Sequence, residues 1–264
     1  LHESKNIKGK FYKDIDDLRQ LGTDIVNSIS RTFGNIAGSI RWRKGYLNKN
    51  HNIAQEIKLK LKPLDILLEK TPFALTDLFI PGFYGHVAIY LGTKKQLISN
   101  GMWDHHLIIP LRHKIEAGFN IIESLRPGVS LNTIEGFFNI DHISIFRVKS
   151  IENDYFNSIY QKYTTALSQF HKEYDFNFDV TTLDKIVCSE LIYHTFGDIK
   201  WPTRLRLGRH TIEPDYLVEV NYYDNSPIKF IHHIESFSEE NIKRPSEQFL
   251  GSRLNFVLNE ERST

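Results

Sequence analysis

The chain has 264 residues, of which 41% are hydrophobic and 12% aromatic, so a wholly disordered chain is excluded and a sizeable folded core is expected. Its 33 basic and 32 acidic side chains nearly balance, which argues against nucleic acid as a partner. One cysteine, Cys188, excludes a disulfide within the chain. No hydrophobic run is long enough to span a bilayer, because the longest uncharged stretch, 78–93, contains Pro81 and several glycines.

Residues 1–58 are predicted to form an N-terminal helical extension. Hydrophobic residues recur there at helical spacing: Ile15, Leu18, Leu21, Ile25, Ile29, Phe33 and Ile36. The basic and aromatic segment Arg41–Lys44 would suit peripheral contact with a membrane or cell envelope, but we interpret it as a solvated helix end. The chain begins at Leu1 instead of a methionine, so we expect that an upstream segment has been removed. If that segment was a signal peptide, the expected location is a cell envelope or periplasm, or outside the cell.

Residues 59–222 are predicted to form the main domain, of α+β class, and residues 223–264 a final strand and a polar tail that pack on it. Segments rich in β-branched and aromatic residues predict strands, and a continuous hydrophobic stripe predicts a long helix. The strands lie at 84–92, 120–124 and 142–148, and the short hydrophobic run after Pro63 is predicted to enter the sheet. The long helix lies at 151–172, and a second helix begins at Cys188. A polar connection, 93–120, separates the first two strands, and we predict that it forms a lid or specificity wall.

The helix that begins at Cys188 is amphipathic, with Leu191, Ile192 and Phe196 on one face. A thiol in the first turn of a helix faces unpaired backbone N–H groups, and the positive end of the helix dipole favours thiolate over thiol. A lone cysteine is nevertheless more often a small buried hydrophobic residue than a nucleophile. The choice between the two depends on whether the chain also supplies a base and a group that orients it.

Two further side chains are candidates for these roles. His86 stands at the beginning of the first predicted strand, which would hold its ring rigidly, and it is the candidate base. Glu123, on the second strand, is the candidate that would hold the other ring nitrogen of His86. The connection between these strands offers Asn100 and Asp104 as rivals to Glu123. Taken singly, a histidine or a glutamate in such a position is usually structural.

Five segments, taken together and in order, favour a catalytic role for these residues over a structural one. They are G-H-V-A-I-Y-L-G at 85–92, I-E-S at 122–124, R-P-G-V at 126–129, Y-D at 174–175 and V-C-S-E-L at 187–191. In this combination the chain resembles the circularly permuted papain-like cysteine hydrolases of the NlpC superfamily, in the YiiX/YebB-like group. In that group a histidine strand S-H-V-G-I precedes a strand L-E-A, a Y-D dipeptide and a helix that opens C-S-E-L, which reverses the chain order of papain.

The resemblance spans about Leu61 to Phe196 and implies a small antiparallel sheet packed on the cysteine helix. It implies Cys188 as nucleophile, His86 as general base and acid, and Glu123 as the orienting group, with no cofactor. It further implies hydrolysis of an amide or peptide bond, for instance in a cell-wall peptide, through an acyl-enzyme. An acyl-lipid hydrolase or acyltransferase, and a catalytically inactive binding module, are the alternatives on the same fold.

Other residues are expected to contact the substrate. Tyr174 and Asp175 match the Y-D dipeptide of the group and are expected to line the cleft, and Tyr84 and Ser189 are the remaining expected contacts. Aromatic residues at positions 79, 83 and 84 would suit an acyl chain and would suit a core equally well. The histidines near positions 105, 113 and 232 lack the spacing and the third ligand of a zinc hydrolase, so we expect no metal site.

Overall fold

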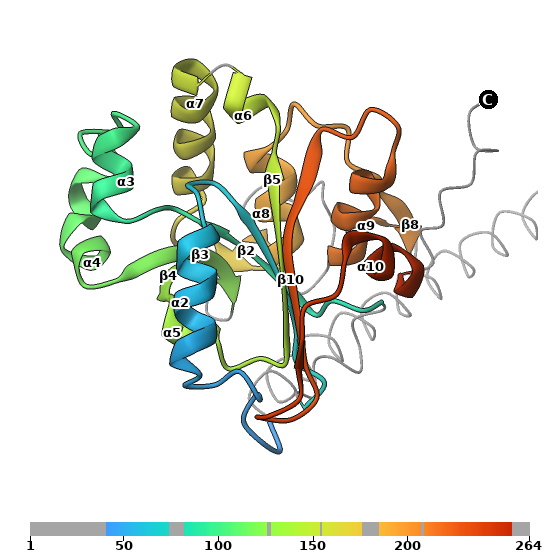
Figure 1. Ribbon diagram of the computed structural model, residues 1–264. Coiled ribbons are helices and arrows are strands. Elements are labelled where there is room, and N and C mark those ends of the chain that lie inside the picture. Colours follow the sequence, from blue (N-terminus) through green and yellow to red (C-terminus); the bar gives the residue numbers. More distant parts are fainter. Residues whose placement is uncertain are drawn as a thin grey trace, which may run out of the picture.

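The computed structural model describes residues 41–73, 82–125, 128–153, 155–175, 185–206 and 209–254. At its centre, seven strands form one antiparallel sheet in the order β11-β10-β5-β1-β2-β3-β4 (Figure 1). The strands are β1 (Ile66–Lys70), β2 (His86–Tyr90), β3 (Phe119–Leu125), β4 (Gly128–Thr133), β5 (His142–Val148), β10 (Ile228–Ser236) and β11 (Ile242–Lys243). The sheet is larger than the small sheet we predicted, because two strands that the sequence pattern did not predict, β4 and β11, form its two edges.

Helices and two short strand pairs surround this sheet. The helices are α2 (His51–Lys60), α3 (Lys94–Ser99), η2 (Ile109–Leu111), α4 (Arg112–Glu116), α5 (Ile134–Phe137), α6 (Ser150–Asn153), α7 (Tyr155–Ser168), α8 (Cys188–Thr195), α9 (Pro214–Glu219), η3 (Val220–Tyr222) and α10 (Glu247–Arg253). The short strands are β6 (Glu173–Tyr174) beside β7 (Lys185–Ile186), which are parallel, and β8 (Arg204–Arg206) beside β9 (Arg209–Thr211), which are antiparallel. The single long helix predicted over 151–172 corresponds to α6 and α7.

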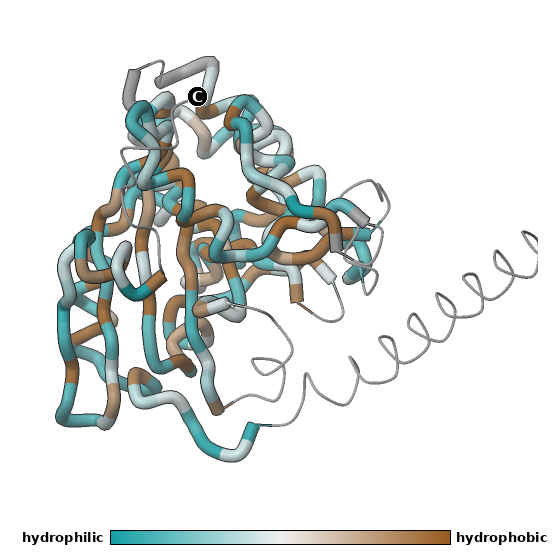
Figure 2. The backbone as a smooth tube through the Cα atoms, turned by 90° about the vertical axis from the view of Figure 1, so that its right-hand side faces the viewer, coloured by the Kyte–Doolittle hydropathy of each residue, from teal (hydrophilic) through white to brown (hydrophobic). Residues whose placement is uncertain are grey.

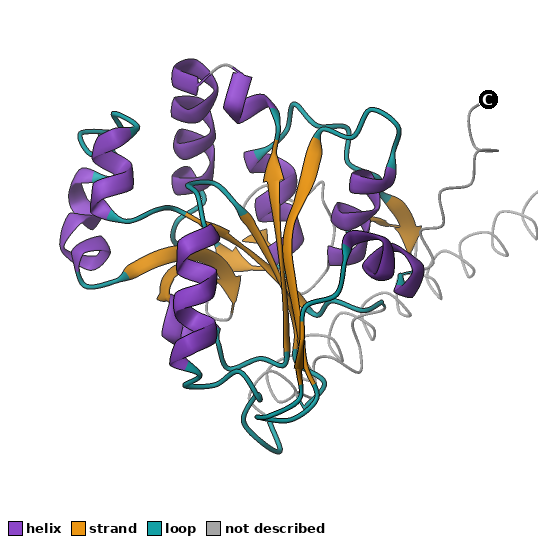
Figure 3. Ribbon diagram, in the orientation of Figure 1, coloured by secondary structure: helices purple, strands orange, loops and turns teal. Residues whose placement is uncertain are grey.

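Alternation along β2 sends its side chains into two hydrophobic cores, one on each face of the sheet. Val87 and Ile89 pack in the core that contains Leu191 of α8. Ala88 and Tyr90 pack in the other core, which α2 and α5 cover. Helices therefore lie on both faces of the sheet (Figure 3), and the hydrophobic segments concentrate between the layers while the outer loops are hydrophilic (Figure 2). The fold class is α+β, as the sequence predicted.

The N-terminal segment is described only in part, since residues 1–40 and their helical periodicity lie outside the described residues. Its described helix, α2, packs Ile53 and Ile57 into the core beneath the sheet. In the basic segment, Trp42 is 57% exposed, whereas Arg43 forms an ion pair with Asp141. The domain boundaries and a contact with a membrane surface stay predictions. Within the described ranges no helix is both long enough and hydrophobic enough to cross a membrane.

The connection 93–120, predicted to be a lid, folds as α3, η2 and α4. These helices follow Leu91, which lies at the end of β2 opposite to His86. Between α3 and η2, His105 bonds the hydroxyl of Thr164 on α7 at 3.0 Å. β2 has five residues and is therefore about 17 Å long. In Figure 1 α3 and α4 lie beside β3 and β4, at one end of the sheet. Because His86 begins β2 and this connection follows the other end of the strand, the prediction of a lid over His86 is wrong, and the specificity wall stays a prediction.

Glu56 ties α2 to the last strands of the sheet. Its carboxylate accepts hydrogen bonds from Arg244 at 2.6 Å and from the ring of His232 at 2.7 Å. The hydrogen bond from Arg244 is the main reason that the pKa of Glu56 is lowered from 4.5 to about 2, against the opposing effect of burial.

We expect Glu56→Gln to lower the free energy of unfolding at pH 7 by about 1 kcal/mol, because solvent screens this partly exposed ion pair. The folded-state pKa is the lower one, so the loss is full above about pH 4.5 and disappears as the pH falls through about 2. Urea denaturation between pH 7 and pH 2 measures it, with the exposed Glu240→Gln as the control. A loss that does not change with pH would contradict this origin.

Candidate active site

Cys188 is the first residue of α8, and the rest of the C-S-E-L motif builds the start of this helix. The N–H of Val187 donates to Glu190 Oε2 at 2.9 Å, which satisfies a donor just before the first turn. Ser189 Oγ donates at 2.6 Å to a backbone carbonyl just before α9. Leu191 is fully buried in the core against the sheet. The last three residues of the motif therefore have structural tasks, and Cys188 stays the candidate nucleophile.

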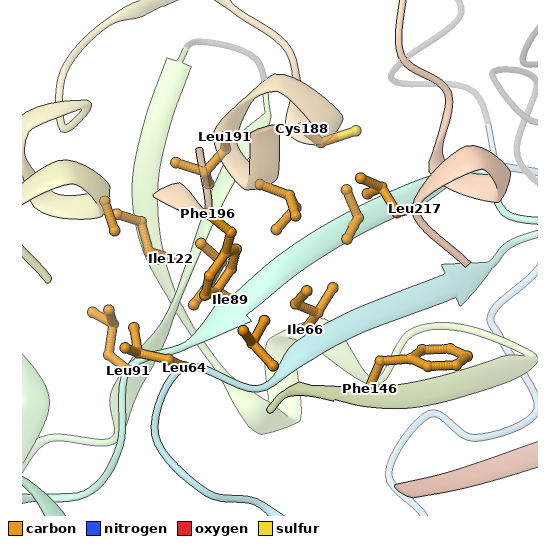
Figure 4. Packing of buried hydrophobic residues seen from close by; sticks show 14 of the residues in the cluster. Leu64, Ile66, Ile89, Leu91, Ile122, Phe146, Cys188, Leu191, Phe196 and Leu217 are labelled. Atoms are coloured by element: carbon orange, nitrogen blue, oxygen red, sulfur yellow. The ribbon is translucent and has the colours of Figure 1, made fainter. Parts of the chain in front are cut away.

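The sulfur of Cys188 lies at the edge of the hydrophobic core. Figure 4 shows the residue at the end of the cluster away from Leu64 and Leu91, with its sulfur pointing away from the other labelled side chains. The residue is 6% exposed. Its own N–H belongs to the first turn of α8, where backbone donors have no acceptor within the helix. A backbone donor and the positive end of the helix dipole thus accompany the sulfur, as an oxyanion hole requires.

The Y-D dipeptide lies beside the strand that leads into α8. Tyr174 pairs with Ile186 in the parallel β6–β7 pair, and the N–H of Asp175 donates to the carbonyl of Ile186 at 3.4 Å. Ser124 Oγ of β3 donates to the same carbonyl at 2.7 Å. Asp175 is fully buried and Tyr174 is half-buried. Both residues therefore hold the approach to Cys188, and their predicted contact with substrate stays a prediction.

His86 and Glu123 meet because of the register between β2 and β3. Glu123 lies opposite Ala88, and His86 is two residues before Ala88, so the two side chains share one face of the sheet as diagonal neighbours. His86 Nε2 lies 2.8 Å from Glu123 Oε2, and the two residues are 7% and 2% exposed. The ring nitrogen left for the thiol of Cys188 is therefore Nδ1.

The charges around His86 favour its protonated form. Burial by itself lowers the pKa of His86, but the charge and hydrogen bond of Cys188, followed by those of Glu123, outweigh burial and raise the pKa well above its ordinary value of 6.5. One imidazole thus interacts with the thiol on one side and with the carboxylate on the other. An imidazole in this environment can hold a proton taken from the thiol at neutral pH.

Asn132 and Phe137 also belong to this site, and the sequence analysis did not identify them. Asn132 Nδ2 donates to the second oxygen of Glu123, Oε1, at 2.7 Å. The ring of Phe137 lies 6.3 Å from that of His86, centre to centre. Asn132 lies near the end of β4 and Phe137 is the last residue of α5, in a segment for which the sequence did not predict a strand. An asparagine and a threonine just before a short hydrophobic helix were the available signal, and they indicate only a helix cap.

Asp215 holds the loop that leads into His86, and the sequence analysis gave it no role. Its carboxylate accepts the N–H groups of Phe83 at 2.7 Å and Tyr84 at 2.8 Å. Gly82 in this loop has φ +102°, and a Cβ there would lie 2.4 Å from Asp215 Oδ2. The glycine therefore provides both the backbone conformation and the room that this carboxylate needs.

The other predicted site residues have structural surroundings. Tyr84 is 1% exposed and its hydroxyl bonds Ser144 Oγ at 2.5 Å. Ser189 is 2% exposed, with its hydroxyl bonded as described above. Their assignment to substrate binding stays a prediction. Of the two rivals to Glu123, Asp104 is exposed and forms an ion pair with Arg112, and Asn100 is the buried C-cap residue of α3.

Two of the histidines considered as metal ligands, His232 and His233, bond protein groups. His232 bonds Glu56, as described above, and His233 bonds Ser144 at 2.6 Å and Glu235 at 3.1 Å. In the part of the chain that the structure describes, no group of three or more histidine, cysteine, aspartate or glutamate side chains is arranged to hold a metal ion.

Comparison with known families matches residues 60–242 to the model of the permuted papain-like amidase enzymes of the YaeF/YiiX, C92 family. The chain belongs to this family. The match includes His86, Glu123 and Cys188, and it begins at the last residue of α2. Comparison with curated proteins and comparison with solved structures give no match.

Membership in the amidase family confirms the resemblance noted in the sequence and identifies the chain as an amidase-like cysteine hydrolase of permuted papain-like fold. It also explains the order of the elements. The strand that carries His86 comes about a hundred residues before the helix that carries Cys188, yet α8 packs directly against β2 and β3. A papain-like thiol and imidazole can thus come together although their order in the chain is reversed.

Proposed function

We propose that this enzyme hydrolyses an amide or peptide bond with Cys188 as nucleophile, His86 as general base and acid, and Glu123 as the residue that orients His86. One observation carries the proposal: a single buried imidazole interacts both with Cys188 and, at 2.8 Å, with the carboxylate of Glu123. Cell-wall peptides are the substrate class that we would test first. This choice rests on the family resemblance.

The reaction follows from this arrangement. His86 takes the proton of the Cys188 thiol, and the resulting thiolate attacks the carbonyl carbon of the amide. The N–H of Cys188 donates to the oxygen that becomes negative in the tetrahedral intermediate. The carbon–nitrogen bond then breaks while His86 gives its proton to the leaving amine, which leaves a thioester on Cys188. His86 next removes a proton from water, and the hydroxide attacks the thioester carbonyl. The carbon–sulfur bond breaks, the sulfur takes the proton back from His86, and the carboxylic acid is released.

Glu123 contributes through His86 and does not contact the reacting carbonyl. Its hydrogen bond to Nε2 fixes the tautomer and the ring orientation, so that Nδ1 faces the thiol. Its negative charge stabilises the imidazolium while the thiolate exists. With its orientation fixed in this way, the imidazole of His86 acts first as the base that deprotonates Cys188 and then as the acid that protonates the leaving amine.

The described residues give no specific support to an acyl-lipid substrate. That alternative depended on the aromatic residues before His86. Tyr84 is buried, and the ring of Phe83 stacks on His142 at 5.6 Å with an angle of 18° between the planes. Position 79 lies outside the described residues. These aromatic rings therefore serve packing, and the amide substrate is retained.

The acyl-enzyme is the species to look for. We expect that incubation with cell-wall peptide fragments or with simple peptide amides raises the intact mass of the protein by one acyl group, which hydroxylamine removes. Because the chain has one cysteine, the position of a thioester is unambiguous. Protein treated beforehand with iodoacetamide is the control and should form no adduct. Hydrolysis that continues unchanged after this treatment would contradict the proposal and would favour an unrelated site.

A further inference from the structure

Asn132 is placed to control the orientation of Glu123. Ser130 lies opposite Glu123 in the β3–β4 pair, and Asn132 is two residues further along, on the same face of the sheet. Its Nδ2 lies 2.7 Å from Glu123 Oε1. The two oxygens of Glu123 thus have separate partners, since Oε1 meets Asn132 and Oε2 meets His86. Rotation of the carboxylate would break both hydrogen bonds together.

The direction of the Asn132 amide is determined by its other end. Asn132 Oδ1 accepts the N–H of Thr133 at 2.8 Å, and a backbone N–H can only donate. The oxygen must therefore face Thr133, and the NH₂ group must face Glu123. The opposite assignment would leave the N–H of Thr133 facing a donor and Glu123 facing an oxygen.

Gly136 provides the space in which this amide lies. A Cβ at position 136 would lie 2.2 Å from Asn132 Oδ1 and 3.2 Å from Thr133 Oγ1. The N–H of Gly136 donates to Thr133 Oγ1 at 3.0 Å and caps the short helix α5. The backbone of α5 is thus held close to Asn132, so a side chain at position 136 has to displace the amide.

We infer that Asn132 is a positioning residue of the hydrolase, held by the space at Gly136, which keeps Glu123 aligned on His86 and so maintains the reactive pair of His86 and Cys188. This inference rests on the proposed function, because it assigns a role to Asn132 only through Glu123 and His86. Asn132 bonds Glu123 at 2.7 Å and Glu123 bonds His86 at 2.8 Å, and the charge and hydrogen bond of Cys188 act on His86. Gly136, within α5, contributes the space that the amide of Asn132 occupies.

The test uses the full chain and the rate at which iodoacetamide alkylates its single cysteine, followed from pH 5 to pH 10. We expect Asn132→Ala to lower the rate near pH 7 by about tenfold, the effect of a shift of one pKa unit in the partner imidazole. The rate at pH 10 should be unchanged, because an ordinary thiol is largely ionised at that pH without a partner imidazole. Asn132→Asp keeps the size of the side chain but replaces the donor by an acceptor, and it should show the same loss.

Two glycine variants make a matched pair. Gly136→Ala is expected to reproduce the loss seen with Asn132→Ala, although it removes no hydrogen-bonding atom. Gly197→Ala is the control, since a Cβ there would meet nothing closer than 3.5 Å. Alkylation profiles of Asn132→Ala and Asn132→Asp that equal the wild-type profile would overturn the inference, as would a loss of equal size at every pH, which indicates only a disturbed fold.

The same measurement separates this inference from the proposed function. If His86→Gln lowers the rate near pH 7 and Asn132→Ala does not, the inference fails and the proposed function stands. If His86→Gln itself leaves the rate near pH 7 at the wild-type value, the proposed function fails, and the inference fails with it.

Discussion

Replacing Cys188 by alanine is expected to lower amide hydrolysis by roughly 10⁴-fold or more, because no other group of the site can form the covalent acyl intermediate. The substitution removes one sulfur atom from the edge of the core, where the side chain already points away from its hydrophobic neighbours (Figure 4). We therefore expect the variant to fold. Turnover of a peptide amide measures the effect, and circular dichroism with thermal unfolding establishes that the fold is kept.

Leu191→Ala is a useful companion to this variant. Leu191 lies in the same helix and is fully buried, so its truncation should cost about 2–5 kcal/mol of stability. At a temperature where it remains folded, it should still form the acyl-enzyme. The opposite pattern, with an active Cys188→Ala variant, would exclude thiol catalysis by this chain.

Replacing Glu123 by glutamine is expected to lower turnover by about 10²-fold and to move the alkaline limb of the pH–rate profile to lower pH. The sign follows from the charge. The negative charge of Glu123 helps to raise the pKa of His86 well above 6.5, so removing it lowers that pKa, and the imidazolium is lost at a lower pH. The turnover number of a peptide amide, measured from pH 5 to pH 10, gives both quantities.

Glu235→Gln is the matched control for this change. Glu235 is 1% exposed, lies on β10 of the same sheet, and also bonds a histidine, His233, at 3.1 Å. Its substitution should lower stability, because it weakens an ion pair with Arg253, but it should leave the alkaline limb in place. An alkaline limb that moves equally in both variants would show that the effect of Glu123 is a general change in charge and not an action on His86.

Much of the local structure followed from short-range patterns. The hydrophobic run after His86 is a strand, and the amphipathic pattern after Cys188 is a helix, because the preference for each depends on residues only a few positions apart. The strand at 142–148 has the predicted bounds, since its hydrophobic residues and its ends are both visible in the sequence. The polar 93–120 connection was misjudged in its position relative to the site, because its polarity does not reveal which end of the sheet it covers.

The edge strand β4 shows the limit of such patterns. Its residues, G-V-S-L-N-T, have a weak alternation, and they form a strand because β3 offers hydrogen-bonding partners beside them. Asn132 lies in this strand, so its link to Glu123 could not be found before the pairing was known. The sequence likewise does not reveal that Gly136 leaves space for the amide of Asn132, because a glycine before a phenylalanine resembles an ordinary turn residue.

The sequence by itself determined the permuted papain-like family, the α+β class and the residue types for an activated thiol. Each of these depends on short contiguous segments, chiefly the motif around Cys188 and the strand that begins at His86. Only the tertiary structure decided which carboxylate lies against His86, with Asp104 exposed on another surface and Glu123 at 2.8 Å. It also decided that Asn132 lies against Glu123 and that the 93–120 connection lies away from the site. These outcomes depend on strand register and on packing between segments far apart in the chain, which no local pattern specifies.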